Sequence, residues 1–99
     1  VLRHSAFLNK PVKKVALCGG SGFFMLPDAM SCNADVYVTA DVKYHDFFDA
    51  DGRILLVDAG HFETEQYAKD IIADYIIKKN SNFAVLISEV NTNSINYFV

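Results

Sequence analysis

The chain has 99 residues, enough for one small domain with a hydrophobic core. Its composition is 52% hydrophobic and 21% charged, which excludes an intrinsically disordered chain. The net charge of -3, with lysines and acidic residues interspersed, argues against a nucleic-acid-binding or membrane-surface protein. No apolar stretch reaches the roughly 18 residues that a membrane helix needs.

The spacing of the cysteines and the amino-terminal sequence both favour a cytoplasmic protein. Cys18 and Cys32 are the only cysteines and have neither metal-type nor redox-type spacing, so we expect buried free thiols in a reducing compartment. The first ten residues lack the layout of a signal peptide. Because the chain opens at Val1, without a methionine and within what reads as folded sequence, we expect a fragment of a longer protein.

Short apolar runs alternate along the chain with helical patterns. Buried strands are predicted at Val15–Cys18, Val36–Thr39, Ile54–Val57 and Phe83–Ser88. Helices are predicted at Phe23–Ser31, where Pro27 either lies in the first turn or kinks the helix, and from His61 to Lys79. A short helix or turn is predicted near Lys43–Phe48, and Ala50–Gly52 is predicted as a turn. This alternation predicts a single α/β domain over residues 1–99, with a mostly parallel sheet and helices packed on it. The tail "NTNSINYFV" (Asn91 to Val99) is predicted to be either an edge strand or a strap.

The start of the long helix carries two unusual residues. On a helix, Glu65 lies about 40° from His61, in the same sector as Ala68 and Ile72, so both polar side chains extend the predicted apolar stripe. A carboxylate on such a stripe needs a partner or a cation. The i, i+4 spacing places both side chains together, as in helical metal sites, and the pair follows the carboxyl end of a strand. The pattern therefore favours a metal site.

A second interpretation of the same residues stays open. Acidic residues in a first helical turn complement the helix dipole, and Glu63 and Glu65 would both do so. The same spacing of a histidine and an acidic residue recurs at His45 and Asp49. His61 and Glu65 are thus either ordinary helix-start residues or half of a site.

Two other stretches are weaker candidates. "CGGSG" (Cys18 to Gly22) follows a strand and is either a loop that presents backbone N–H groups to an anion or a tight turn between strand and helix. It matches neither nucleotide-binding glycine motif. Asp41 follows the second strand, and either pairs structurally with His45 or Lys43 or belongs to a site.

Four stretches together resemble the carboxyl-terminal segment of the Nif-three-like family of dinuclear-metal proteins, also described as GTP cyclohydrolase type 2 homologues. They are "VALCGGSG", "VYVTADVKYHDFFDA", "LLVDAGHFETEQ" and "SEVNTNSINYF", in the family's order. The resemblance implies that the chain is the carboxyl-terminal portion of a longer metal-binding protein with a larger two-lobed fold. It also implies that His61 and Glu65 are ligands of a centre with two divalent metal ions per subunit. The family's remaining ligands, a His-His pair and an aspartate, are not found here.

The resemblance further implies a toroidal homohexamer with its metal centres facing the cavity. By the same analogy Asp41 and His45 lie near the metal cleft. Asp41 would contact the substrate or support a metal ligand, and His45 would be the catalytic acid or base. Ala40 stands where the family often has glycine. A ligand set of histidine and carboxylate suits zinc, manganese, iron or nickel without choosing among them.

Two functions from different classes follow. The intact protein is either a metal-dependent hydrolase of the GTP cyclohydrolase type 2 kind, acting on a nucleotide-type small molecule, or a metal-stabilised oligomeric binding or regulatory protein without catalysis. For the 99-residue chain alone we expect weak metal binding and no catalysis, because it holds only part of the ligand set.

Overall fold

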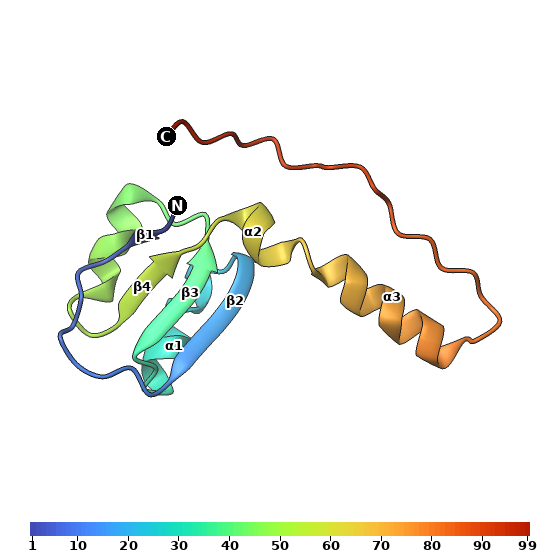
Figure 1. Cartoon of the computed structure of the whole chain (residues 1–99). Helices are drawn as coiled ribbons and strands as arrows, with labels where there is room; N and C mark the ends of the chain where they lie inside the picture. Colours follow the sequence, from blue (N-terminus) through green and yellow to red (C-terminus); the bar gives the residue numbers. More distant parts are fainter. The chain divides into compact units, whose positions relative to one another are not determined.

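The computed structural model describes all residues from 1 to 99 and divides into two compact units, Val1–Glu65 and Gln66–Val99. Unit 1 holds a four-stranded sheet in the order β1-β4-β3-β2 (Figure 1). The strands are β1 (Arg3–His4), β2 (Val15–Ser21), β3 (Val36–Ala40) and β4 (Leu55–Asp58). β2 with β3 and β3 with β4 pair in parallel, whereas β1 is antiparallel to β4. The predicted α/β fold with a mostly parallel sheet is therefore confirmed.

Short helical segments connect the strands of unit 1. The 3-10 helix η1 (Phe23–Met25) leads into α1 (Leu26–Ser31), whose first turn contains Pro27 as predicted. A second 3-10 helix, η2 (Tyr44–Ala50), ends at Asp51, which has a left-handed conformation and forms the predicted turn with Gly52. The unit closes with α2 (His61–Glu65).

The hydrophobic core of unit 1 lies on one face of the sheet. Tyr37 and Leu56 project from β3 and β4 into a cluster with Leu26 and Ala29 of α1, and all four are at most 5% exposed. The core residues not yet named are Ala34, Val42, Ala50 and Ile54. Burial of this apolar surface is the main force that holds α1 and η2 against the strands.

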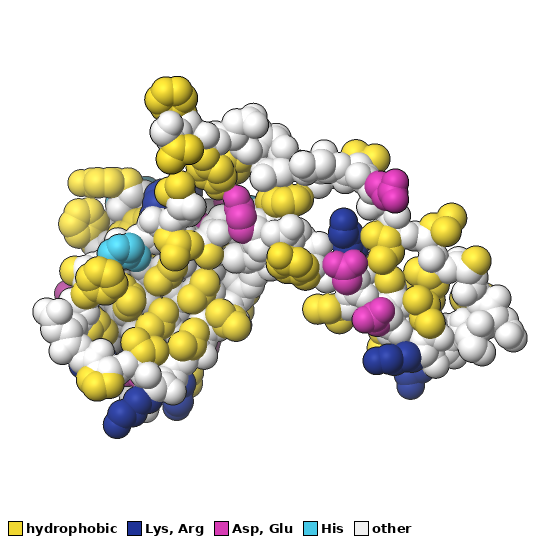
Figure 2. Space-filling view, in the orientation of Figure 1, with side chains coloured by type: hydrophobic (Ala, Val, Ile, Leu, Met, Phe, Trp, Pro, Cys, Tyr) yellow, Lys and Arg dark blue, Asp and Glu magenta, His cyan; other side chains and the backbone are white.

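The opposite face of the sheet is apolar and open. Val15 and Leu17 of the edge strand β2 are 51% and 75% exposed. The strand register aligns Leu17 with Val38 of β3 and Val57 of β4, which are partly buried, so the apolar row continues across the sheet and is most exposed at β2. Figure 2 shows hydrophobic side chains gathered over the strands. Within unit 1, this second face of the sheet is therefore less completely covered than the face that packs on α1.

The glycine-rich stretch of β2 contains a bulge that is held by hydrogen bonds with two side-chain hydroxyl groups of β3. β2 pairs regularly with β3 up to Leu17 and again at Ser21, with a bulge between them. Across this bulge the buried Thr39 hydroxyl donates to the Gly20 carbonyl (3.1 Å) and accepts from the Gly22 amide (2.9 Å). The Tyr37 hydroxyl donates to the Gly22 carbonyl at 2.6 Å. "CGGSG" is therefore mainly strand and not the predicted loop or turn, because side-chain hydroxyls replace the missing ladder bonds.

Replacing Thr39 by valine should lower the free energy of unfolding by about 1–3 kcal/mol, since both buried backbone groups lose their partner while the shape is kept. Thr39→Ser is the matched control and should keep most of the stability, because it retains the hydroxyl. Urea denaturation of the three proteins measures the difference. A valine variant as stable as the threonine protein would show that these hydrogen bonds contribute nothing net.

Unit 2 contains α3 (Ala68–Lys79) followed by residues 80–99, which have no regular secondary structure. The predicted single helix from His61 to Lys79 is wrong, because Gln66 and Tyr67 interrupt it and separate α2 from α3. The apolar stripe inferred for that helix is also not buried, since Ile72 and Tyr75 are 59% and 63% exposed. No helix of the chain has the length and apolar character needed to cross a membrane.

The predicted strand at Phe83–Ser88 is not observed either. A strand is stabilised by hydrogen bonds to a neighbouring strand, and unit 2 contains none. The tail therefore does not form the predicted edge strand. It is extended chain with local turns, in which the Asn91 and Asn93 side chains accept hydrogen bonds from the amides of Asn93 and Ile95.

Candidate metal site at the carboxyl ends of the strands

The candidate site lies where the parallel strands β3 and β4 end. Asp41 follows β3 directly, and α2 begins with His61 three residues after β4. Because β3 and β4 are parallel, their carboxyl ends meet at the same edge of the sheet, where open α/β sheets bind their ligands. Ala40, in the position where glycine was expected, is a regular strand residue with no exposed surface, and the left-handed φ of 56° falls on Asp41 instead.

The His61 imidazole sits between two carboxylates. Its Nδ1 lies 2.6 Å from Asp41 Oδ2, and its Nε2 lies 3.0 Å from Glu65 Oε2. The side chains of His61, Asp41 and Glu65 are 45%, 50% and 52% exposed, so solvent and solutes can reach all three. The expected placement of His61 and Glu65 side by side on one helix face is confirmed. The burial of that face is not, because α2 is a separate short helix with no buried residue.

The electrostatics of the site favour a positive charge on the imidazole. The hydrogen bond to Asp41 and its negative charge raise the pKa of His61 above its ordinary value of 6.5. Desolvation opposes this shift, and the charge and hydrogen bond of Glu65 make smaller contributions in the same direction as Asp41. In the folded protein without metal, the interaction of protonated His61 with the two carboxylates stabilises the fold. This stabilisation is fully present below pH 6.5 and is lost as the pH rises through the raised pKa of His61. Two carboxylates around one imidazole thus attract a cation, whether a proton or a metal ion.

A glycine from β2 provides the space for this arrangement. A Cβ atom on Gly20 would overlap the Glu65 carboxylate and would lie 3.3 Å from His61 Nε2. The Gly20 amide donates to the Thr64 hydroxyl (2.9 Å), which in turn donates to the Gly60 carbonyl (2.8 Å). β2 and α2 are therefore held together at the point where the two candidate ligands emerge. Gly20 and Thr64 were not singled out from the sequence.

The remaining predicted residue, His45, is placed differently. Its Nε2 lies 3.4 Å from Asp46 Oδ1 within η2, and its side chain is 73% exposed. Asp46 also accepts a hydrogen bond from the Lys43 amide. The pairing of Asp41 with His45 or Lys43 is therefore wrong, because Asp41 has a left-handed backbone conformation and contacts His61. The structure brings three of the four predicted residues together and leaves His45 outside the cluster.

The donor chemistry fits part of a metal site. A neutral imidazole nitrogen and a carboxylate oxygen 3.0 Å apart are close enough to bind one cation, and Asp41 on the other ring nitrogen is the arrangement typical of metal-bound histidines. The two carboxylates lie on different ring nitrogens, so they do not converge with His61 on one point. No group of three or more His, Cys, Asp or Glu side chains in the 99 residues is arranged to hold a metal. A complete site needs ligands from outside this chain.

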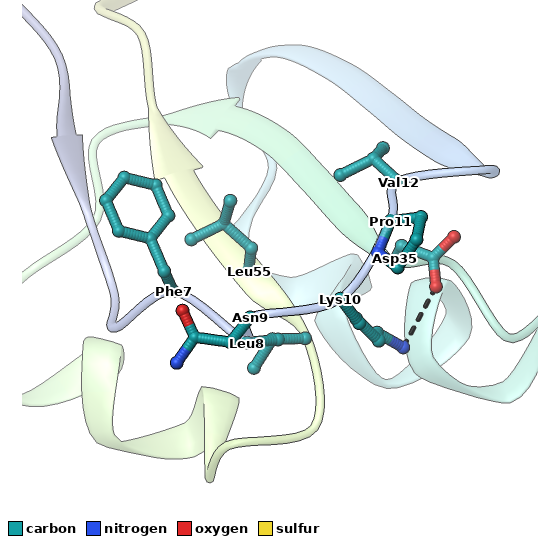
Figure 3. A pocket seen from close by; sticks show the side chains of 8 residues that line it. All are labelled: Phe7, Leu8, Asn9, Lys10, Pro11, Val12, Asp35 and Leu55. Atoms are coloured by element: carbon teal, nitrogen blue, oxygen red, sulfur yellow. Dashed lines mark ion pairs between the residues drawn. The ribbon is translucent and has the colours of Figure 1, made fainter.

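A cavity elsewhere in unit 1 does not include these residues. It measures about 470 Å³ and lies between the connection from β1 to β2 and the start of the strands (Figure 3). Asp35 precedes β3 and Leu55 begins β4, so the cavity belongs to the amino ends of the strands. Lys10 forms a 2.9 Å ion pair with Asp35 at its rim. The cavity is lined by Phe7, Leu8, Asn9, Lys10, Pro11, Val12, Asp35 and Leu55.

The fold and the site together define an α/β protein with a histidine between two carboxylates at the carboxyl ends of its parallel strands. The chain belongs to the Duf34/NIF3 (NGG1p interacting factor 3) family, whose sequence model matches residues 1–94. The resemblance noted in the sequence is thereby confirmed.

Individual relatives agree with this assignment. The chain is 33% identical over 100 residues to a protein of Staphylococcus epidermidis named "GTP cyclohydrolase 1 type 2 homolog", covering 97% of this chain and 27% of that protein. It is 35% identical over 99 residues to a protein of Campylobacter jejuni with the same name, covering 99% of this chain and 39% of the relative. The chain thus spans about a third of the length of the relatives it matches.

Solved structures show the same fold. Staphylococcus aureus protein SA1388 matches with a TM-score of 0.78 and 29% identity, over 99% of this chain and 33% of that one. A Bacillus cereus protein related to NIF3 matches with a TM-score of 0.75 and 29% identity, over 99% of this chain and 28% of that one.

Proposed function

We propose that this chain is the carboxyl-terminal part of a dinuclear metal-binding protein, and that the intact protein is a metal-dependent hydrolase acting on a nucleotide-type substrate. The observation that carries the proposal is the 3.0 Å contact between His61 Nε2 and Glu65 Oε2, in a space that only glycine at position 20 leaves open. The name "GTP cyclohydrolase 1 type 2 homolog" of the relatives supports the substrate class. The intact protein would be a cytoplasmic homohexamer, and the free thiols of Cys18 and Cys32 suit that compartment.

Each residue of the cluster has a distinct role in this proposal. His61 Nε2 and Glu65 would hold a divalent ion, whether zinc, manganese, iron or nickel. Asp41 would accept a hydrogen bond from His61 Nδ1–H, which favours the tautomer with a free lone pair on Nε2 and keeps the ring in place. Bound divalent ions would supply a polarising charge and lower the pKa of bound water. His45, exposed on η2, would hold and transfer a proton at its Nε2.

One observation favours a second function. His45 pairs with Asp46 and not with the cluster around His61, so the predicted acid or base of this chain does not lie against the proposed metal position. A metal-stabilised oligomeric binding or regulatory protein needs no such donor. Nucleotide turnover by the intact protein, with and without added divalent ions, tests the choice. Turnover that requires metal and falls in His45→Ala supports the hydrolase, metal binding without turnover supports the binding protein, and no metal binding overturns both.

Replacing Asp41 by asparagine should lower the affinity of the intact protein for Zn²⁺ about 10- to 100-fold, as expected when the carboxylate partner of a metal-bound histidine is lost. Isothermal titration calorimetry measures the change. Asp49→Asn, an equally conservative change at a carboxylate of η2, is the control and should bind as the unmodified protein does. Equal affinity of Asp41→Asn and the control would remove Asp41 from the site.

Metal affinity should fall as the pH is lowered, and the fall should begin above pH 6.5. The raised pKa of His61 makes protons compete with the metal ion for Nε2 at a higher pH than they would at an ordinary histidine. In Asp41→Asn the decrease should begin at lower pH, since the largest cause of the raised pKa is gone. Titrations with Zn²⁺ between pH 5.5 and about 8 would follow both curves. An affinity that is independent of pH over this range would show that no histidine has to lose a proton.

A further inference from the structure

A buried carboxylate next to the site is used by neither metal binding nor proton transfer. Asp58, the last residue of β4, is 5% exposed, and both of its oxygens are engaged. Oδ2 accepts a hydrogen bond from the Val42 amide at 3.0 Å, and Oδ1 accepts one from the Gly60 amide at 3.0 Å. Val42 directly follows Asp41, and Gly60 directly precedes His61.

An arginine from the edge strand completes this arrangement. The Arg3 guanidinium forms an ion pair with Asp58 Oδ2 and also donates to the Val42 carbonyl at 2.9 Å. Both backbone polar groups of Val42 are thus fixed, one by the carboxylate and one by the guanidinium. These bonds hold the turn at Asp41, whose left-handed φ of 56° is uncommon for a residue other than glycine.

We propose that Asp58 is the positioning residue of the Asp41–His61 pair: one carboxylate binds the two backbone turns that carry the two members. The pair joins residues 20 positions apart in the sequence, and its 2.6 Å contact depends on the separation of these two turns. Asp58 touches neither side chain, so it acts through the backbone amides. The expected effect of Asp58 on metal affinity rests on the proposed function. Its expected effect on the distance between Asp41 and His61 does not.

The test uses the intact protein and the isosteric variant Asp58→Asn, in which the amide NH₂ cannot accept a hydrogen bond from the second backbone amide. Crystal structures without metal should show the contact between His61 Nδ1 and Asp41 Oδ2 opened beyond 3.5 Å from its present 2.6 Å. A contact kept at hydrogen-bond distance would overturn the inference. This readout needs no metal, so it decides the role of Asp58 even if the unmodified protein binds none, an outcome that would refute the proposed function alone.

Calorimetry with Zn²⁺ tests the consequence for binding in a double-mutant cycle with Asp41→Asn. Asp58→Asn should lower affinity roughly 10-fold in the unmodified background and less than about 3-fold when Asp41 is already replaced. Equal losses in both backgrounds would mean that Asp58 only stabilises the fold and would overturn the proposal. Ile54→Val, which trims a fully buried core residue, controls for lost stability and should leave affinity unchanged. If Asp58→Asn does not fold, Asp58→Glu, which keeps the charge beside Arg3 but displaces both oxygens, decides the matter on the same two readouts.

Discussion

Replacing His61 by alanine should lower the affinity of the intact protein for Zn²⁺ or Mn²⁺ by at least about 100-fold. Loss of a partner outside the ligand shell commonly costs 10- to 100-fold, and the loss of the ligand itself should exceed that. The free energy of unfolding should change little, because His61 is half-exposed and begins a short helix with no buried residue. Calorimetric titration of the two proteins measures the effect.

The matched control for His61→Ala is His4→Ala. His4 is exposed on β1, where its Nδ1 contacts the Ser5 carbonyl and its ring packs at a tilt of 35° against Phe7. It has no carboxylate partner and belongs to the first strand, so its loss should leave metal affinity unchanged. If both alanine variants bind metal as tightly as the unmodified protein, the histidine at position 61 is an ordinary helix-start residue.

Gly20→Ala should weaken metal binding about 10-fold or more, because the new methyl group would occupy the space of the Glu65 carboxylate beside His61 Nε2. It should also lower the free energy of unfolding by about 1–2 kcal/mol, since Gly20 has a left-handed φ of 67°. Metal titration and urea denaturation measure the two effects separately.

Gly52→Ala separates the steric effect from the backbone effect. Gly52 has nearly the same φ, 65°, but no atom lies within 4 Å of the position of an added Cβ. This variant should lose about 1–2 kcal/mol of stability and none of the metal affinity. If both variants lose the same metal affinity, the effect of Gly20→Ala comes from reduced stability and not from steric conflict with the Glu65 carboxylate.

The local part of the structure followed from sequence patterns. Continuous apolar runs located three of the strands, and the i, i+4 spacing correctly placed His61 beside Glu65. These features depend on residues within one or two turns of each other, so periodicity alone is enough to predict them. The positions of His61 and Glu65 do not by themselves establish that the pair binds a metal ion.

The contacts between distant segments did not follow from the pattern. Asp41 meets His61 only because β3 and β4 lie side by side, and Gly20 lies against Glu65 within the irregular stretch of β2 between Leu17 and Ser21. β1 was missed, since two residues carry no periodicity. The break after Glu65 was missed because the apolar pattern continues through it, while a helix ends by losing backbone hydrogen bonds that the pattern does not encode.

Anomalous diffraction from crystals of the intact protein, grown with Mn²⁺ or Zn²⁺, tests most directly whether His61 and Glu65 hold a metal together. We expect a peak at about 2.0–2.2 Å from both His61 Nε2 and a Glu65 carboxylate oxygen, with Asp41 still bound to Nδ1. A metal bound elsewhere, while the imidazole and the Glu65 carboxylate remain in direct contact, would contradict the account.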